Sequence, residues 1–317
     1  MDKLIKTIKF FFFFSLLVSF SSCFSMEKNQ QPDNTKPMYG EVLKNEIYKK
    51  LDKEFIENCI QQYGTIDSAV IVHINYAWGY FYRNDVTTAM KRFNQAWLLN
   101  PEFPDSYFGF AALLDMQKNT TEAVRFYKIG LKKDSIHQRA EICYQKIADC
   151  KEQLNDIVGT IEVYTKITVL NPNNAFAFKK LGYLQIPSEA ALNAFDKAIS
   201  LDPNDPHTFI NRGYLYQLRE DYPESIIDFT KAISLAPENI SDYVNRGIVE
   251  MLINNNQDAK KDFEMCVHLN PKSGELHRFL GLSKLNLNDK QGACTDFEKA
   301  KELGDEQSQE LINQNCK

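Results

Sequence analysis

Four segments of the chain share one pattern: RFNQAWLLNP (92–101), AFDKAISLDP (194–203), DFTKAISLAP (228–237) and DFEMCVHLNP (262–271). The last three begin 34 residues apart, at positions 194, 228 and 262. Alignment on these segments places seven copies of a two-helix unit between about residue 70 and residue 305. A single helix pair cannot bury its apolar face alone, so the period predicts a stacked array rather than one globular core.

Each copy has small and aromatic residues at fixed positions. One position of the second helix is aromatic in all seven copies: Phe93, Tyr127, Tyr164, Phe195, Phe229, Phe263 and Phe297. A position of the first helix is always Gly or Ala: Ala77, Ala111, Ala148, Gly182, Gly213, Gly247 and Gly281. The facing position of the second helix is also small: Ala89, Ala123, Thr160, Ala191, Ser225, Ala259 and Ala293. Antiparallel helices can approach closely where the facing side chains are short, and the aromatic ring then fills the gap beside the crossing.

This order of small, small and aromatic residues, closed by a proline in five copies, resembles the tetratricopeptide repeat family over about three quarters of the chain. The resemblance implies an all-α, right-handed α-solenoid of about seven hairpins, with first helices that line a concave groove. The predicted repeats, an array over 70–305, are 70–103, 104–137, 141–172, 175–203, 206–237, 240–271 and 274–305. Amphipathic stretches at 39–69 and 306–317 are predicted to be N- and C-terminal capping helices, since each end of a stack exposes an apolar face.

The family's groove-facing positions, carried over onto this sequence, are rich in aromatic residues. They are Trp78, Phe81, Tyr82, Phe108, Met116, Phe176 and Tyr183. Such side chains provide large contact area for a partner, although any one of them could instead pack between adjacent first helices. The Lys and Asn set by which some family members hold acidic chaperone C-termini is missing, because Tyr183 stands where Asn is needed beside Lys179. The tripeptides Asn-Arg-Gly at 211–213 and 245–247 recur in register and predict a polar ladder between helices.

The N-terminus has the pattern of an export signal. Three lysines precede an apolar run from Phe10 to Phe20, which is shorter than the roughly 20 residues that span a bilayer. Residues 1–22 are therefore predicted to be a signal peptide. Phe20-Ser21-Ser22-Cys23 resembles the bacterial lipoprotein cleavage box, which implies a lipid on Cys23. The box usually has Leu where Phe20 stands, so cleavage near Ser25 to give a soluble periplasmic protein is the alternative. Residues 23–38, polar and proline-bearing, are predicted to be a flexible tether.

The cysteines suggest one disulfide. Cys294 lies about ten residues before the turn near Gly304 and Cys316 about twelve after it, so the two come level in an antiparallel hairpin. A bond between them would join the C-terminal cap to the last repeat, and free buried thiols are the alternative. Cys143 and Cys150 are separated by about 10.5 Å of helical rise, which is too far to bridge.

Composition and motifs point away from catalysis and nucleic acid. The net charge is -5, and Lys and Arg are dispersed among acidic residues, so no phosphate-binding face is expected. The five histidines are scattered, without HExxH, zinc-spaced cysteines or a phosphate-binding glycine loop, so we expect no enzyme activity, no cofactor and no metal. His73 and His277 occupy an apolar position and are predicted to be packed in the core.

These observations favour a non-enzymatic scaffold of the bacterial cell envelope. It would be held to a membrane by an N-terminal lipid and would bind a protein or peptide segment in its groove. A ligand- or nutrient-capture lipoprotein is one alternative. An enzyme with residues scattered through the sequence is a second. A cytosolic repeat scaffold is a third, and it requires that the first 22 residues stay attached.

Overall fold

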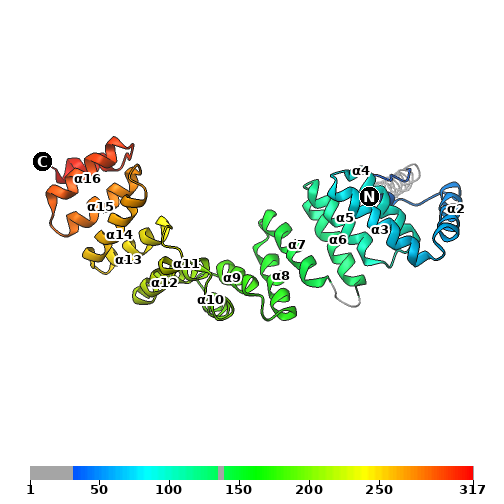
Figure 1. The fold of residues 1–317 in the computed structure, drawn as a ribbon, viewed down its shortest axis with the longest axis horizontal. Helices are drawn as coiled ribbons and strands as arrows, with labels where there is room; N and C mark the ends of the chain where they lie inside the picture. The colour runs from blue at the N-terminus through cyan, green and yellow to red at the C-terminus, as the bar shows by residue number, and fades with distance from the viewer. Residues whose placement is uncertain (1–30, 135–138, 317) are drawn as a thin grey trace, which may run out of the picture. The chain divides into compact units, whose positions relative to one another are not determined.

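The computed structural model describes residues 31–134 and 139–316, so the predictions on residues 1–22 and on Cys23 lie outside the described residues. Within these ranges the regular structure is one 3-10 helix and sixteen α-helices, with no strand (Figure 1). The chain divides into two compact units, Met1–Leu154 and Asn155–Lys317, and the division falls between the two helices of the third predicted repeat.

The first unit contains two complete helix pairs, α3 with α4 and α5 with α6, which pack beside one another (Figure 1). Its elements are η1 (Pro37–Glu41), α2 (Glu46–Tyr63), α3 (Ile66–Tyr82), α4 (Val86–Leu99), α5 (Pro104–Met116), α6 (Thr120–Lys133) and α7 (Ala140–Gln153). Helix α3 begins at Ile66, ahead of the predicted start of the first repeat at residue 70. The cause is a cap: the Thr65 hydroxyl accepts the backbone N–H of Ser68 at 3.1 Å.

The second unit contains four complete pairs: α9 with α10, α11 with α12, α13 with α14, and α15 with α16. Its helices are α8 (Ile157–Leu170), α9 (Ala175–Leu184), α10 (Glu189–Leu201), α11 (Pro206–Leu218), α12 (Tyr222–Leu235), α13 (Ile240–Leu252), α14 (Asn256–Leu269), α15 (Gly274–Asn286), α16 (Lys290–Glu302) and α17 (Ser308–Asn315). The first helices α9, α11 and α13 contact one another in sequence, and α17 packs on α16 at the C-terminal end.

The core of each unit is the row of ring-filled crossings that the sequence predicts. Phe93, Tyr164 and Phe195 are completely buried, as are Phe229, Phe263 and Phe297 at the same position of later repeats. The ring packs so closely against the first helix that no side chain fits at the glycine position of the crossing. A Cβ atom added at Gly182 would lie 2.5 Å from Cε1 of Phe195, well inside van der Waals contact.

The turn inside most hairpins uses one left-handed residue. Asn84, Lys118, Asn155, Glu220, Asn254 and Asn288 have φ between 54° and 64° and follow the first helix of their pairs. Asn tolerates this conformation best among the non-glycine residues, which explains its use at four of these six positions. The α9–α10 connection, residues 185–188, is one residue longer and contains Pro187 instead.

Residues 33–38, predicted to belong to the flexible tether, are bound to the first unit. The buried side chain of Asn94 on α4 donates to the backbone oxygen of Lys36 at 2.8 Å and to that of Asn34 at 3.2 Å. The polar, proline-bearing composition indicated an unbound segment. Composition could not reveal that the amide side chain of Asn94, 58 residues from Lys36 in the sequence, hydrogen-bonds the backbone of this segment.

We predict that Gly182→Ala destabilises the second unit and that Gly79→Ala does not. The new methyl at position 182 must displace the Phe195 ring, at a cost of about 1–3 kcal/mol of unfolding free energy. Position 79, in the middle of α3, has only the end of the Arg83 side chain within 4 Å, so alanine should stabilise that helix by up to about 1 kcal/mol. Urea titrations of the two variants measure both values, and equal effects at the two glycines would contradict the packing described.

Candidate functional site

Large apolar side chains are exposed in equivalent positions on the adjacent first helices of the second unit. We call this set the aromatic face; its members are 45–60% exposed, and they are Phe176, Tyr183, Tyr214, Leu218 and Leu252. Tyr183 and Tyr214 each follow the crossing glycine of their helix, and Leu218 and Leu252 stand at the same position of consecutive repeats. Since α9, α11 and α13 contact one another in order, the aromatic face is one surface of the unit.

Charged groups lie beside the aromatic face. Lys179 on α9 donates to Asp205, the N-cap of α11, at 2.9 Å, and both side chains are largely buried. Hydrogen bonds from Thr208 and Lys179 outweigh the opposing effect of burial, so the pKa of Asp205 is lowered. The Lys179 ammonium therefore joins α9 to α11.

The predicted groove residues of the first unit form a separate group. Trp78 and Phe81 are half-buried and make an edge contact with ring centroids 5.2 Å apart, and Trp78 also contacts the core ring of Phe93 at 5.2 Å. Tyr82 and Met116 are exposed. The other two predicted groove residues, Phe176 and Tyr183, belong to the second unit.

Phe108 was predicted to face the groove, and this prediction is wrong. Its side chain is only 4% exposed. The ring lies against Gly130 of α6, where an added Cβ would come within 2.3 Å of Phe108 Cε1. Gly130 has no side chain, so it leaves space between α5 and α6. The Phe108 ring on α5 fills this space. Phe108 is a core residue.

Three members of the aromatic face were missed from the sequence: Tyr214, Leu218 and Leu252. The signal was available, since Tyr214 follows Gly213 as Tyr183 follows Gly182. Exposure of Tyr214 could not be inferred, however, because Trp78 at the same position of the first repeat is half-buried against Phe93.

The predicted polar ladder is confirmed. Arg212 binds both carboxylate oxygens of Asp228 at 2.7 Å and also binds Asp196 on α10, the second helix of the preceding repeat. One repeat later, Arg246 binds Asp262 at 2.9 and 2.6 Å and donates to the Thr230 hydroxyl at 2.9 Å. Each guanidinium joins its own hairpin to the one before, so these arginines have a structural role and are not free to bind a ligand.

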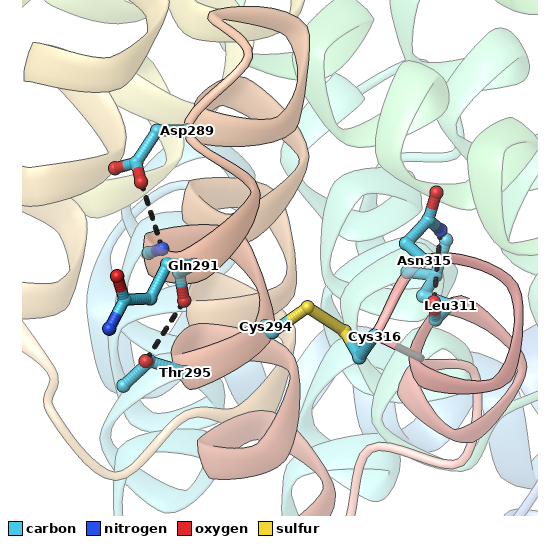
Figure 2. Close-up of a disulfide and its surroundings, with 8 residues drawn as sticks. Asp289, Gln291, Cys294, Thr295, Leu311, Asn315 and Cys316 are labelled. Carbon is cyan, nitrogen blue, oxygen red and sulfur yellow. Dashed lines mark hydrogen bonds between the residues drawn. A yellow bond between two sulfur atoms is a disulfide. The ribbon is translucent and has the colours of Figure 1, made fainter.

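Cys294 and Cys316 form a disulfide, with Cα atoms 5.6 Å apart, that joins α16 to the end of α17 (Figure 2). The other described cysteines, Cys59, Cys143, Cys150 and Cys266, are free and buried. Burial raises the pKa of Cys143 and of Cys266 to about 12, so neither presents a nucleophilic thiolate near neutral pH.

The two predicted core histidines differ in environment. His73 is buried beside Cys59, with Nε2 3.7 Å from the sulfur, and burial lowers its pKa. His277 is partly buried and its Nε2 lies 3.2 Å from the backbone oxygen of Pro271. Among residues 31–134 and 139–316, no group of three or more His, Cys, Asp or Glu is placed to hold a metal. In that same part of the chain, no helix combines the length and apolarity needed to cross a membrane.

Comparisons with known proteins agree with this architecture. Residues 206–239, which contain α11 and α12, match the tetratricopeptide repeat family model. The fold is similar to the C-terminal part of a TPR repeat-containing protein from Cytophaga hutchinsonii, with TM-score 0.64 and 16% identity over 75% of this chain and 98% of that one. It is also similar to a tetratricopeptide repeat protein from Parabacteroides merdae, with TM-score 0.50 and 22% identity over 78% and 99% of the two chains.

A third similar structure is the MamA protein, with TM-score 0.50 and 22% identity over 54% of this chain and 95% of that one. Identities this low show the fold alone, and they confirm the predicted all-α solenoid class. The chain thus carries the tetratricopeptide repeat and has the fold of tetratricopeptide repeat proteins. No curated protein matches it in sequence.

We predict that Arg212→Met destabilises the second unit by about 3 kcal/mol, because it leaves the buried Asp228 carboxylate without its partner. Arg219→Met is the control. Its ion pairs with Glu189 and Asp221 are exposed, so the melting temperature should hardly change. Adding Asp228→Leu to Arg212→Met removes the orphaned charge and should restore most of the loss. Thermal unfolding of the three variants tests this, and a double variant no more stable than Arg212→Met would contradict it.

Proposed function

We propose that this protein is a non-enzymatic interaction scaffold that binds a protein or peptide segment on the aromatic face of α9, α11 and α13. One observation carries the proposal: exposed apolar side chains recur in register on adjacent helices there. Exposed apolar residues scattered singly are normal on a soluble protein, whereas a contiguous patch marks an interaction site. Tyr183 and Tyr214 offer rigid rings with a polar tip, which suits them to anchor a partner.

The chemistry of this surface defines the partner. The aromatic face offers apolar and aromatic area, and the nearby Lys179 is already paired with Asp205. The matching segment therefore has apolar or aromatic anchors rather than a cluster of carboxylates. Absence of a recognisable catalytic motif and the raised thiol pKa values support a binding rather than a catalytic role.

We also propose that the protein is exported and held at a bacterial membrane by a lipid on Cys23. The support is the sequence of residues 1–23 together with the disulfide between Cys294 and Cys316. Structural disulfides persist in oxidising compartments outside the cytosol, so the bond argues against the cytosolic scaffold. A soluble periplasmic form remains the alternative to the lipid-anchored one.

Substitution of the aromatic face tests the binding proposal. Tyr183→Asp with Tyr214→Asp should weaken binding of the natural partner at least about tenfold, because both rings would be central contacts. Ile227→Asp on the second helix α12 is the matched control, since Ile227 is equally exposed but belongs to the other helix of its pair. The partner is first captured in source cells with a photocrosslinking residue at position 183, 214 or 227. Capture from position 227 alone, or unchanged affinity of the double variant, would contradict the proposal.

Mass spectrometry of the native protein from membrane and soluble fractions tests the location. We expect a diacylated or triacylated Cys23 at the N-terminus in the membrane fraction, and a peptide pair linked through Cys294 and Cys316. Alkylation of the folded protein should leave Cys143 and Cys266 unmodified, because both thiols are buried and protonated. An intact Met1 in the soluble fraction would refute export, and an unlipidated N-terminus near Ser25 would indicate the soluble periplasmic form.

A further inference from the structure

The segment of residues 33–44, called here the strap, lies on the second helices of the first unit. Asn94 of α4 holds its backbone at several points. The Asn94 amide donates to the backbone oxygens of Asn34 and Lys36 and to the Asn34 side chain, and its oxygen accepts the Tyr39 N–H at 3.4 Å. Asn94 therefore recognises mainly peptide groups, which every polypeptide carries.

Tyr39 and Glu41 make further side-chain contacts of the strap with α4 and α6, and Lys44 of the strap pairs with Asp52 of α2 at 2.7 Å. The Tyr39 ring packs against Trp97 of α4 with centroids 6.4 Å apart, and Lys44 Nζ lies over the Tyr39 ring, 3.8 Å from its centroid. The Glu41 carboxylate pairs with Arg125 of α6, which also binds Glu122 at 2.9 Å. An aromatic residue and an acidic residue two positions later are thus the side-chain features that this surface receives.

The strap fits this surface poorly. Met38, Tyr39 and Glu41 have φ of 48°, 57° and 58°, a left-handed conformation that is unfavourable for residues with a Cβ atom. No residue of η1 is buried. Hollows lie along both sides of the strap, about 440 Å³ on the side that includes Met90, Leu114 and Phe126 and about 360 Å³ on the side that includes Trp97 and Leu98.

A strained segment with hollows on both sides is displaceable by one that fills the space without strain. We propose that the outer surface of α4 and α6 is a second polypeptide-binding site, which the strap occupies in the free protein. The ligand is a segment of a partner protein with an aromatic residue for Trp97 and a carboxylate for Arg125, and Asn94 clamps its backbone. The strap is then an intramolecular competitor that sets the affinity of the site.

The test weakens the strap in the full-length protein and leaves the surface intact. Tyr39→Ala with Glu41→Ala removes both side-chain anchors. The probe is a fluorescent synthetic peptide of residues 31–44, added in trans and followed by anisotropy. We expect the double variant to bind the probe at least tenfold more tightly than the unaltered protein, because the cis competitor is weakened. A probe with the same two alanines should bind at least tenfold less well than the original probe.

Asn94→Ala in the double variant provides the receptor control and should lower probe affinity at least tenfold. Hydrogen exchange of α3 to α6 separates a displaceable strap from a structural one. In the double variant these helices should stay as protected as in the unaltered protein, while the strap amides exchange faster. Equal probe binding by the double variant and the unaltered protein, insensitivity to Asn94→Ala, or loss of protection across α3 to α6 would each overturn the proposal. Tyr183→Asp should leave probe binding unchanged, so this result is independent of the aromatic face.

Discussion

The close crossing of two helices over a glycine or alanine, with an aromatic ring beside it, is the contact on which both units depend. Gly182 and Gly281 bring their helix pairs so close that an added Cβ would be 2.5 Å from the ring of Phe195 or Phe297. Close packing of this kind makes each hairpin a rigid block, and stacked blocks present the same positions of every first helix on one side. The aromatic face exists because this geometry repeats.

The two sides of the second unit are stabilised differently. Arg212 on α11 and Arg246 on α13 each donate three hydrogen bonds to Asp or Thr side chains, and these bonds join consecutive repeats through their second helices. Other side chains of the first helices, those of Tyr183, Tyr214 and Leu218, stay exposed. A scaffold needs both properties, since a partner can bind only where side chains are not already used to hold the stack together.

The first unit shows how one buried polar side chain can organise a segment that lies outside the α-helices. Asn94 occupies a position that is exposed in most other repeats, and here it is fully buried because the strap lies over it. An amide that was neither exposed nor paired would be costly, so the strap and Asn94 depend on each other. Bound through its backbone and strained at Met38 and Tyr39, the strap covers α4 without being part of the helical core.

The repeat, the crossing positions and the arginine ladder could all be predicted from the sequence, because each depends on residues at a constant spacing within a local helix pair. The Cys294–Cys316 pairing was likewise placed by counting residues on either side of one turn. Three features required the tertiary structure. Phe108 is buried because Gly130 on another helix leaves it space, Tyr214 and Leu218 are exposed because no neighbour covers them, and the strap is held by an asparagine 58 residues from Lys36. Periodicity reports which residues share a helix face, whereas burial depends on the volume and polarity of what packs against that face, and distant parts of the chain supply it.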